Sequence, residues 1–153
     1  MSFIVMKFDG LEETYKEIQK LSSESELKEL NKKIVKRAGN MAKEQATGNI
    51  RKKAYSKNPM KSGRRGSRTG QHAADNVPQK GTTQTGNYAQ VIGWDKADTS
   101  PFFYMKFQEW GTSTAPIQTA KEFMLETAHQ VYPQFKNIAE EEYEKVLKEK
   151  LGG

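Results

Sequence analysis

The sequence predicts an α+β fold: a small, mostly antiparallel sheet packed by N-terminal helices and a long C-terminal helix, with a long mobile basic loop. Three observations predict this fold. Short runs of β-branched and aromatic residues are bounded by turn residues, as in strands. Longer stretches near both ends of the chain repeat apolar residues at helical spacing. One aromatic-rich stretch, residues 101–116, is the most apolar part of a polar chain, so the other elements must dock there.

The first strand is expected at residues 2–8, which are β-branched and aromatic and end at a turn of Asp9 and Gly10. A first helix follows, because apolar residues recur there every three or four positions with Glu and Lys between them. Glu in the first turn also suits the helix dipole. The apolar residues of this helix are Leu11, Tyr15, Ile18 and Leu21.

A second helix is expected from Ser23, which has the capping-box spacing to Glu26: each side chain can bind the other residue's backbone N–H. Gly39 inside this helix costs about 1 kcal/mol relative to Ala, and we expect it to permit close packing. The helix should fade between Thr47 and Tyr55. Its expected inner face consists of Leu27, Leu30, Ile34, Ala38, Met41 and Gln45.

A long mobile basic loop is expected over residues 56–87. This segment is rich in Gly, Ser and Thr, and its apolar content is too small to offset the entropy of ordering it. Charge concentrates here: residues 51–80 carry nine basic residues against the single acid Asp75, a net charge of +8 in a chain of +6. The nine are Arg51, Lys52, Lys53, Lys57, Lys61, Arg64, Arg65, Arg68 and Lys80.

Two further strands complete the expected sheet. One lies around residues 77–83, at the end of the basic loop, where Val77 follows two alanines. The other covers residues 88–94, a β-branched and aromatic run bounded by turn residues on both sides. With residues 2–8 they form the three-stranded sheet on which the helices pack.

The aromatic-rich stretch has two local interpretations. Phe103 and Phe107 alternate with polar residues, as on a half-buried strand. Equally, Phe103, Phe107 and Trp110 share one face of a helix. The ends favour a short helix over residues 102–110, because Ser and Pro precede it and Gly111 follows.

The end of this stretch has a structural and a functional interpretation. Trp110 is expected to close the core, with Gly111 allowing a sharp exit of the chain, because large aromatic side chains usually pack internally. Alternatively, the turn presents Thr112 and its neighbours at a contact between subunits. Neither interpretation makes this turn catalytic.

The last element is expected to be a long helix. Thr119 and Glu122 have the spacing of a second capping box. Pro133 lacks a backbone N–H and should kink or split the helix, and the acidic cluster at residues 140–144 is interpreted as a solvated face. The expected inner face consists of Phe123, Met124, Ala128, Val131, Phe135, Ile138, Val146 and Leu151.

Composition argues against several classes of protein. At 153 residues we expect one domain, 1–153, with a small core, because apolar residues make up only 35%. The chain has no cysteine, no apolar run of membrane-spanning length and no secretory signal pattern. His72 and His129 have no second ligand at metal-site spacing. We therefore expect no enzyme, no metal and no cofactor.

Several short motifs resemble those of a known family. The run Phe107–Thr112 (Phe-Gln-Glu-Trp-Gly-Thr), followed by Pro116 and then Phe123-Met124, resembles a signature of the head–tail joining proteins of long-tailed phages, also called tail-completion or minor tail component proteins. Members carry an aromatic-x-Glu-aromatic-Gly-Thr run, a proline and a Phe-Leu-like start to the last helix. Glu122 differs from the second proline that members often have there.

The resemblance extends to two other places. Lys7–Leu11 resembles the family's opening strand, Gly and Leu, and Thr69-Gly70 matches the Thr-Gly that follows its mobile loop. It implies a structural virion protein of the neck or tail, assembled in the host cytoplasm. Copies would form a homo-oligomeric ring, with six the expected number, between a head connector or adaptor and the tail tube or tail terminator proteins.

The function of the basic loop has three interpretations. It could neutralise phosphates of packaged DNA without reading sequence, act as an assembly arm that orders against an acidic partner, or be a solvated loop. The resemblance favours the assembly arm; the alternative function is a small basic DNA-binding protein. The side chains expected to make such contacts are Lys57, Lys61, Arg64, Arg65 and Arg68.

Overall fold

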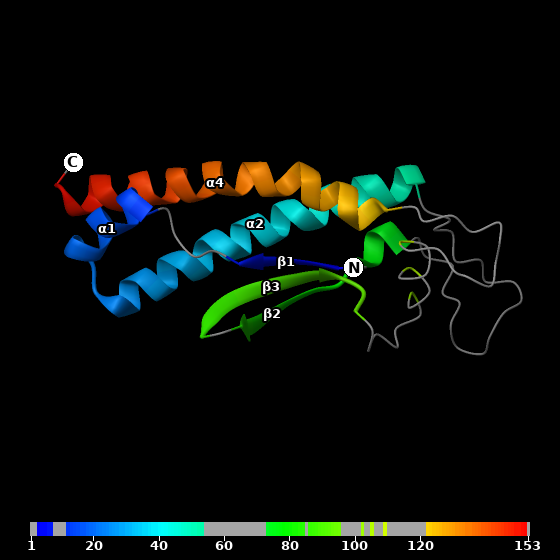
Figure 1. The fold of residues 1–153 in the computed structure, drawn as a ribbon, viewed down its shortest axis with the longest axis horizontal. Helices are drawn as coiled ribbons and strands as arrows, with labels where there is room; N and C mark the ends of the chain where they lie inside the picture. The colour runs from blue at the N-terminus through cyan, green and yellow to red at the C-terminus, as the bar shows by residue number, and fades with distance from the viewer. Residues whose placement is uncertain are drawn as a thin grey trace, which may run out of the picture.

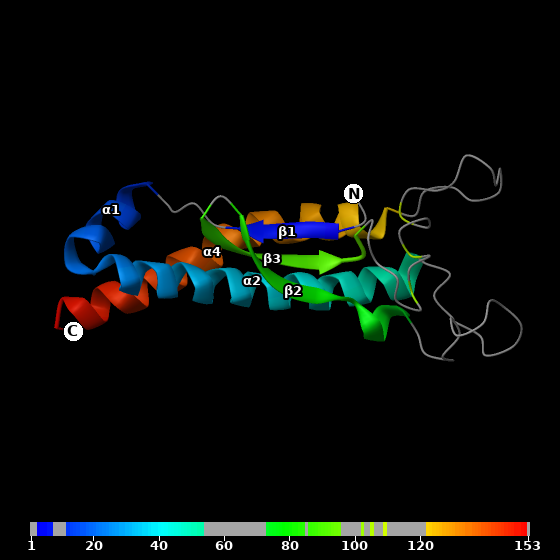
Figure 2. The same cartoon turned by 90° about the horizontal axis from the view of Figure 1, so that it is seen from below.

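A three-stranded sheet lies against a layer of two long helices in the computed structural model (Figures 1 and 2). The structure describes residues 3–7, 12–53, 73–84, 86–95, 102, 105, 109 and 122–152. This architecture confirms the α+β class predicted from the sequence. The elements are β1 (Phe3–Lys7), α1 (Glu12–Leu21), α2 (Glu24–Lys53), the short 3₁₀ helix η1 (Ala73–Asn76), β2 (Gln79–Gln84), β3 (Asn87–Gly93) and α4 (Phe123–Lys150).

The sheet has the strand order β1-β3-β2, and both pairs are antiparallel. In β1, Ile4 pairs with Ile92 of β3 and is buried, as is Met6 two residues on. Because side chains alternate between faces, this register sends the apolar set of β1 and β3 toward the helices. A tight turn joins β2 to β3 and uses Gly86 at φ 81°, a conformation that a residue without Cβ adopts readily.

The later part of the segment expected to be loop, from residue 73 on, has regular structure. Residues 79–84 form β2, close to the strand expected around 77–83, whereas η1 at residues 73–76 was not predicted. Ala73, Ala74 and Val77 are buried in the core. The Thr47 hydroxyl of α2 donates a hydrogen bond to the Ala74 carbonyl at 3.0 Å. Three small apolar residues therefore dock this part of the chain on α2, which low overall hydrophobicity did not reveal.

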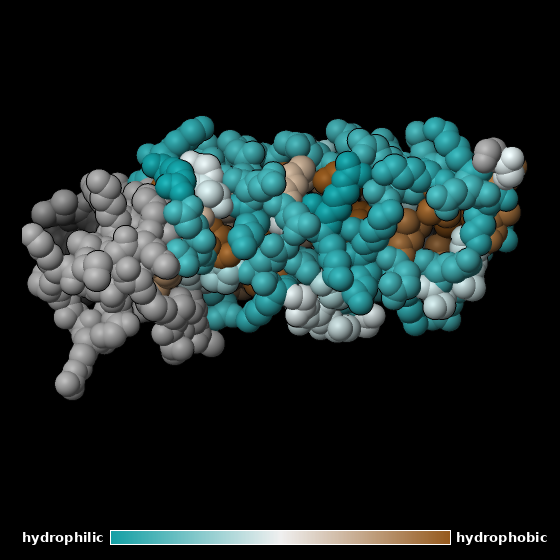
Figure 3. Space-filling model, turned by 180° about the vertical axis from the view of Figure 1, so that it is seen from behind, coloured by the Kyte–Doolittle hydropathy of each residue, from teal (hydrophilic) through white to brown (hydrophobic). Residues whose placement is uncertain are grey.

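The two long helices form one layer and extend past the sheet (Figure 1). α2 packs against both α4 and β3, and α1 packs on the two helices where they project beyond the strands. From behind, most of the surface is hydrophilic, and hydrophobic residues show mainly in hollows toward the end that holds the C-terminus (Figure 3). None of the described helices has the length and apolar character needed to cross a membrane.

The inner face of α2 is wider than predicted. Its first half matches, from Leu27 to Ala38, but Met41 and Gln45 are only half-buried. The buried positions of the second half are Ala42, Ala46, Asn49 and Ile50. The difference arises because α2 packs against the sheet and against α4, so residues on two faces of the helix are buried.

Two local predictions for α2 are confirmed. The Ser23 N–H donates to Glu26 Oε2 at 2.7 Å and the Glu26 N–H donates to Ser23 Oγ at 3.2 Å, which is the expected capping box. Gly39 permits close packing on β3, since a Cβ at this position would lie 3.1 Å from Gln90 Cβ.

Pro133 was predicted to kink or split α4; the helix continues through it as one element, so it is not split. Val131 before the proline and Ile138 after it are both buried, so packing on either side holds the helix together. Leu151 was expected on the inner face but is 70% exposed, because it lies beyond Lys150, the last helical residue.

Candidate functional site

The residues on which the sequence analysis depended most lie outside the described part of the chain. They are Lys57, Lys61, Arg64, Arg65 and Arg68 of the basic loop, and Phe103, Phe107, Trp110, Gly111 and Thr112 of the aromatic stretch and its turn. The structure does describe Phe102, Met105 and Glu109 of the aromatic stretch, the end of α2 and the start of α4.

The described part of the aromatic stretch is buried. Phe102 and Met105 are in the core, and both Met105 and Glu109 have α-helical backbone. The Met105 N–H donates to the Phe102 carbonyl at 3.0 Å. These residues agree with the helical interpretation rather than the strand, and with the expectation that this stretch is a docking point of the core.

Glu109 binds the start of α4. Its carboxylate accepts hydrogen bonds from the Met124 N–H at 2.9 Å and the Leu125 N–H at 3.0 Å. Its carbonyl accepts a third from the Glu122 N–H at 3.2 Å. The first N–H groups of a helix have no partner within the helix, and their dipoles favour an anion. Glu109 thus supplies, from earlier in the chain, the cap that α4 needs.

The Glu109 carboxylate is buried, since Glu109 is 2% exposed. At the start of the same helix the ring of Trp94 meets the ring of Phe123 edge-on, with centroids 6.5 Å apart. Burial raises the pKa of the Glu109 carboxyl above its usual range, and the hydrogen bonds from the Met124 and Leu125 N–H groups offset only part of that effect.

The helix α4 begins three residues later than the predicted capping box of Thr119 and Glu122 required. Glu122 occupies the N-cap position of α4 with φ 50° and makes no side-chain cap hydrogen bond, and Thr119 lies outside the described residues. Glu109 already occupies the donors that a local cap would satisfy. A signal was present in the sequence: Glu109 is an acid within a strongly aromatic stretch, which predicts a buried carboxylate with a specific partner.

A second buried carboxylate joins α4 to α2. Glu142 is 3% exposed, although the acidic cluster around it was expected to be a solvated face. Its oxygens lie 2.9 Å from Lys33 Nζ, 3.1 Å from Arg37 Nη1 and 3.3 Å from Lys145 Nζ. For Glu142 the prediction was wrong, because α2 presents two cations where it packs against α4. Glu140, Glu141 and Glu144 of the same cluster are exposed, as predicted.

The pKa of Glu142 shows which influence is stronger. Burial alone, the largest single influence, raises it. Hydrogen bonds and charge attraction from Lys33 and Lys145 together exceed that effect, so the pKa is lowered and Glu142 is ionised. Its neighbour Glu141 stays half-exposed and accepts a hydrogen bond from Arg37 Nη2 at 2.6 Å.

A neutral polar contact lies between these two carboxylates. The amide of Asn49, buried on α2, donates to the Thr127 hydroxyl at 2.9 Å and to Gln130 Oε1 at 2.8 Å. The Thr127 hydroxyl donates to the Phe123 carbonyl at 2.7 Å, so this network is internally satisfied. It aligns α2 and α4 and leaves no free reactive group.

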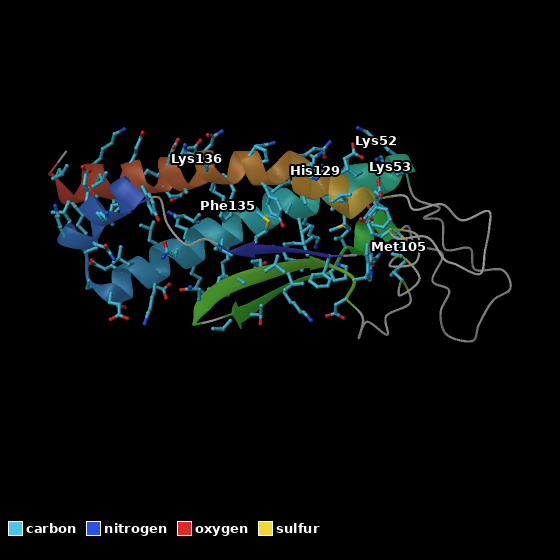
Figure 4. All side chains as sticks on the ribbon, viewed as in Figure 1. Lys52, Lys53, Met105, His129, Phe135 and Lys136 are labelled. Carbon is cyan, nitrogen blue, oxygen red and sulfur yellow. The ribbon has the colours of Figure 1, made fainter. Side chains whose placement is uncertain are left out.

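The described basic residues at the end of α2 are partly neutralised. Arg51 is ion-paired with Asp75 of η1, and Lys53 with Glu126 of α4. Lys52 is exposed beside them (Figure 4). The positive charge offered by this end of α2 is therefore smaller than the sequence count suggests.

Nothing in the described part of the chain assembles a metal site: no three acidic or histidine side chains come together there. His129 is exposed on α4, and His72 is not among the described residues. A hollow of about 400 Å³ opens between α2 and α4 and is lined mainly by polar side chains.

Comparison of the chain with protein-family models, with curated proteins and with solved structures found no match.

Proposed function

We propose that this protein is a structural subunit of a phage virion at the junction of head and tail, where it acts by self-association and docking and not by catalysis. Copies would form a homo-oligomeric ring, with six the expected number, in the virion neck. The head connector or adaptor would lie on one side and the tail tube or tail terminator proteins on the other. Assembly would take place in the host cytoplasm.

The observation that supports this proposal best is the contact between Glu109 and the start of α4. The resemblance depends on an aromatic-x-Glu-aromatic-Gly-Thr run and on a Phe-Leu-like pair further along the chain. Here the Glu of that run, Glu109, binds the backbone of Met124, the second residue of the pair. Two motifs that lie apart in the sequence are thus joined by a hydrogen bond in the structure.

This unit suits a docking protein for a mechanical reason. A glutamate that caps α4 from outside the helix fixes the chain before the Gly-Thr turn relative to the long helix. A surface that must match a partner needs its supporting residues held by packing and hydrogen bonds. In this proposal the basic segment acts as an arm that becomes ordered against a neighbouring ring and so adds interface only on assembly.

The second candidate function is binding of duplex DNA. The observation in its favour is that Arg51, Lys52 and Lys53 continue the basic segment into α2, making one basic end. Against it, Arg51 and Lys53 are already paired with carboxylates. Phosphate contacts by the basic segment would make affinity fall steeply with salt.

Light scattering can distinguish assembly from DNA binding. It would compare the wild type with a variant in which a Gly/Ser linker of the same length replaces residues 58–69. Samples would be measured over a range of concentrations, at low and moderate salt, with and without duplex DNA. Concentration-dependent rings that the replacement abolishes, unaffected by DNA, are the expected result. A monomer that grows only when DNA is added, and less at higher salt, contradicts the assembly proposal and favours DNA binding.

A further inference from the structure

The first four turns of α4 carry a regular row of exposed side chains. The row is Glu122, Leu125, His129, Tyr132 and Lys136, and we call it the α4 stripe. Leu125, His129, Tyr132 and Lys136 lie three or four residues apart within the helix, so they share one face of it. Glu122, the N-cap residue, precedes Leu125 by three residues and ends the row. Two of them are large hydrophobic side chains that are far from buried: Leu125 is 46% and Tyr132 is 50% exposed.

The same face of α4 is covered further along. Tyr143 follows Leu125 by five helical turns, and Ala139 follows Tyr132 by about two turns, so each pair has nearly the same angular position. Ala139 and Tyr143 are both fully buried, and α1 packs on α4 near its C-terminal end (Figure 1). The α4 stripe is therefore the continuation of an interface, and no described element covers it.

The order of residues in the α4 stripe indicates which kind of surface is complementary to it. Going along α4, the stripe reads acid, leucine, histidine, tyrosine, base, with Glu122 and Lys136 each seven residues from His129. Two copies laid antiparallel with the two His129 residues at the centre bring Glu122 of each opposite Lys136 of the other. Leu125 of each then meets Tyr132 of the other. A parallel arrangement would instead place like charges together.

We propose that the α4 stripe binds the α4 stripe of a second copy, in an antiparallel two-fold pair. The contact is isologous: the same patch is used by both copies, which closes the assembly at two. Figure 4 places His129 and Lys136 on α4, in the layer of the molecule away from the strands, where a second helix can approach. Pairing with a second copy would cost Lys136 only a weak interaction, because its ion pair with Glu140 is 3.8 Å long and exposed.

The size of the contact sets its strength. From Glu122 to Lys136 the stripe is about 21 Å long at 1.5 Å per residue. Two helices in contact over this length bury less than the roughly 1,200 Å² typical of stable interfaces. We expect a dissociation constant in the micromolar range, so the pair can be displaced by a stronger partner.

This inference goes beyond the proposed function and does not depend on it. A cyclic ring joins two different surfaces of each copy, whereas the α4 pair joins one surface to itself. Replacement of residues 58–69 should therefore leave the α4 pair intact even if it abolishes rings. Disruption of the stripe, in turn, tests the pair alone.

Disulfide trapping tests the geometry directly, since the chain has no cysteine of its own. His129→Cys should cross-link to itself under mild oxidation. Leu125→Cys and Tyr132→Cys should each stay largely monomeric alone and cross-link when mixed. Glu144→Cys, exposed on the same helix but off the stripe, is the matched control. Cross-linking of His129→Cys no faster than the control, or of Leu125→Cys alone as fast as the mixture, would overturn the proposal.

A charge exchange gives an independent test by sedimentation velocity. Glu122→Lys and Lys136→Glu should each weaken the dimer about tenfold, because each places like charges opposite one another at two sites. The double variant should restore the wild-type dissociation constant, and circular dichroism should be unchanged in all three. A monomeric wild type at high micromolar concentration, or a double variant as weak as the single ones, contradicts the antiparallel pair.

Discussion

Glu109 and Glu142 are both buried carboxylates that fasten α4, but they are surrounded by different groups. Glu109, at the start of the helix, is 2% exposed and accepts hydrogen bonds from backbone N–H groups. Glu142, in the second half, lies within 3.3 Å of three cationic side chains. Burial determines the pKa direction at Glu109, whereas the cations determine it at Glu142.

The difference shows that a buried acid can be held in two ways. At Glu109 the donors belong to the main chain and cannot move away, so loss of the carboxylate leaves them unsatisfied. At Glu142 the cations of Lys33, Arg37 and Lys145 have side chains that are 65%, 42% and 60% exposed, so they can return to water. We expect the first glutamate to matter more for stability and the second to be more sensitive to acid.

The largest effect is expected for Glu109→Ala. It leaves the Met124 and Leu125 N–H groups without an acceptor in a largely dry site, which should cost about 2–3 kcal/mol in the free energy of unfolding. Urea unfolding followed by circular dichroism measures this cost. Glu122→Ala is the control, because the Glu122 side chain makes no cap hydrogen bond and its loss should cost less than about 0.5 kcal/mol. Equal losses in the two variants would contradict the role given to Glu109.

A smaller effect is expected for Glu142→Ala, about 1–2 kcal/mol, because the cations left behind can be solvated. The matched control is Glu141→Ala, the adjacent acid, which also contacts Arg37 but is half-exposed and should cost less than about 0.5 kcal/mol. The same unfolding measurement applies. If the two variants were equally stable, burial of Glu142 would contribute nothing to the joining of α2 and α4.

The smallest and most specific effect is a pair of opposite pH profiles, measured as the stability of the wild type minus that of each Gln variant. The pKa of Glu142 is lowered by folding, so its contribution is present above the unfolded-state pKa of about 4.3 and is lost as pH falls. The pKa of Glu109 is raised, so its pH-dependent contribution is full below that value and declines as pH rises through the folded-state pKa.

We therefore expect two opposite trends when unfolding is measured between pH 3 and pH 7. As pH falls, the stability difference between the wild type and Glu142→Gln should shrink, and the difference between the wild type and Glu109→Gln should grow. Profiles of the same sign would mean that the two carboxylates experience similar surroundings, contrary to the structure.

Short-range patterns were predicted well from the sequence. The capping box of Ser23 and Glu26 formed as expected, because both partners lie within one turn. The strands and helices also fall close to their expected positions, since apolar periodicity reports directly on which face is buried. The predicted inner face of α2 was too narrow, because one periodic pattern assumes a single buried face and α2 has two. Met41 packs against the core while half-buried, and Gln45 is half-buried too.

By itself the sequence determined the α+β class, the strand and helix positions and the concentration of charge in one segment, because these follow from neighbouring residues. Only the tertiary structure decided which acids are buried. Glu109 reaches α4 across a gap in sequence, and Glu142 meets Lys33 and Arg37 only because α2 and α4 cross there. A carboxylate's energy depends on the donors and cations within a few ångströms, and those come from distant parts of the chain.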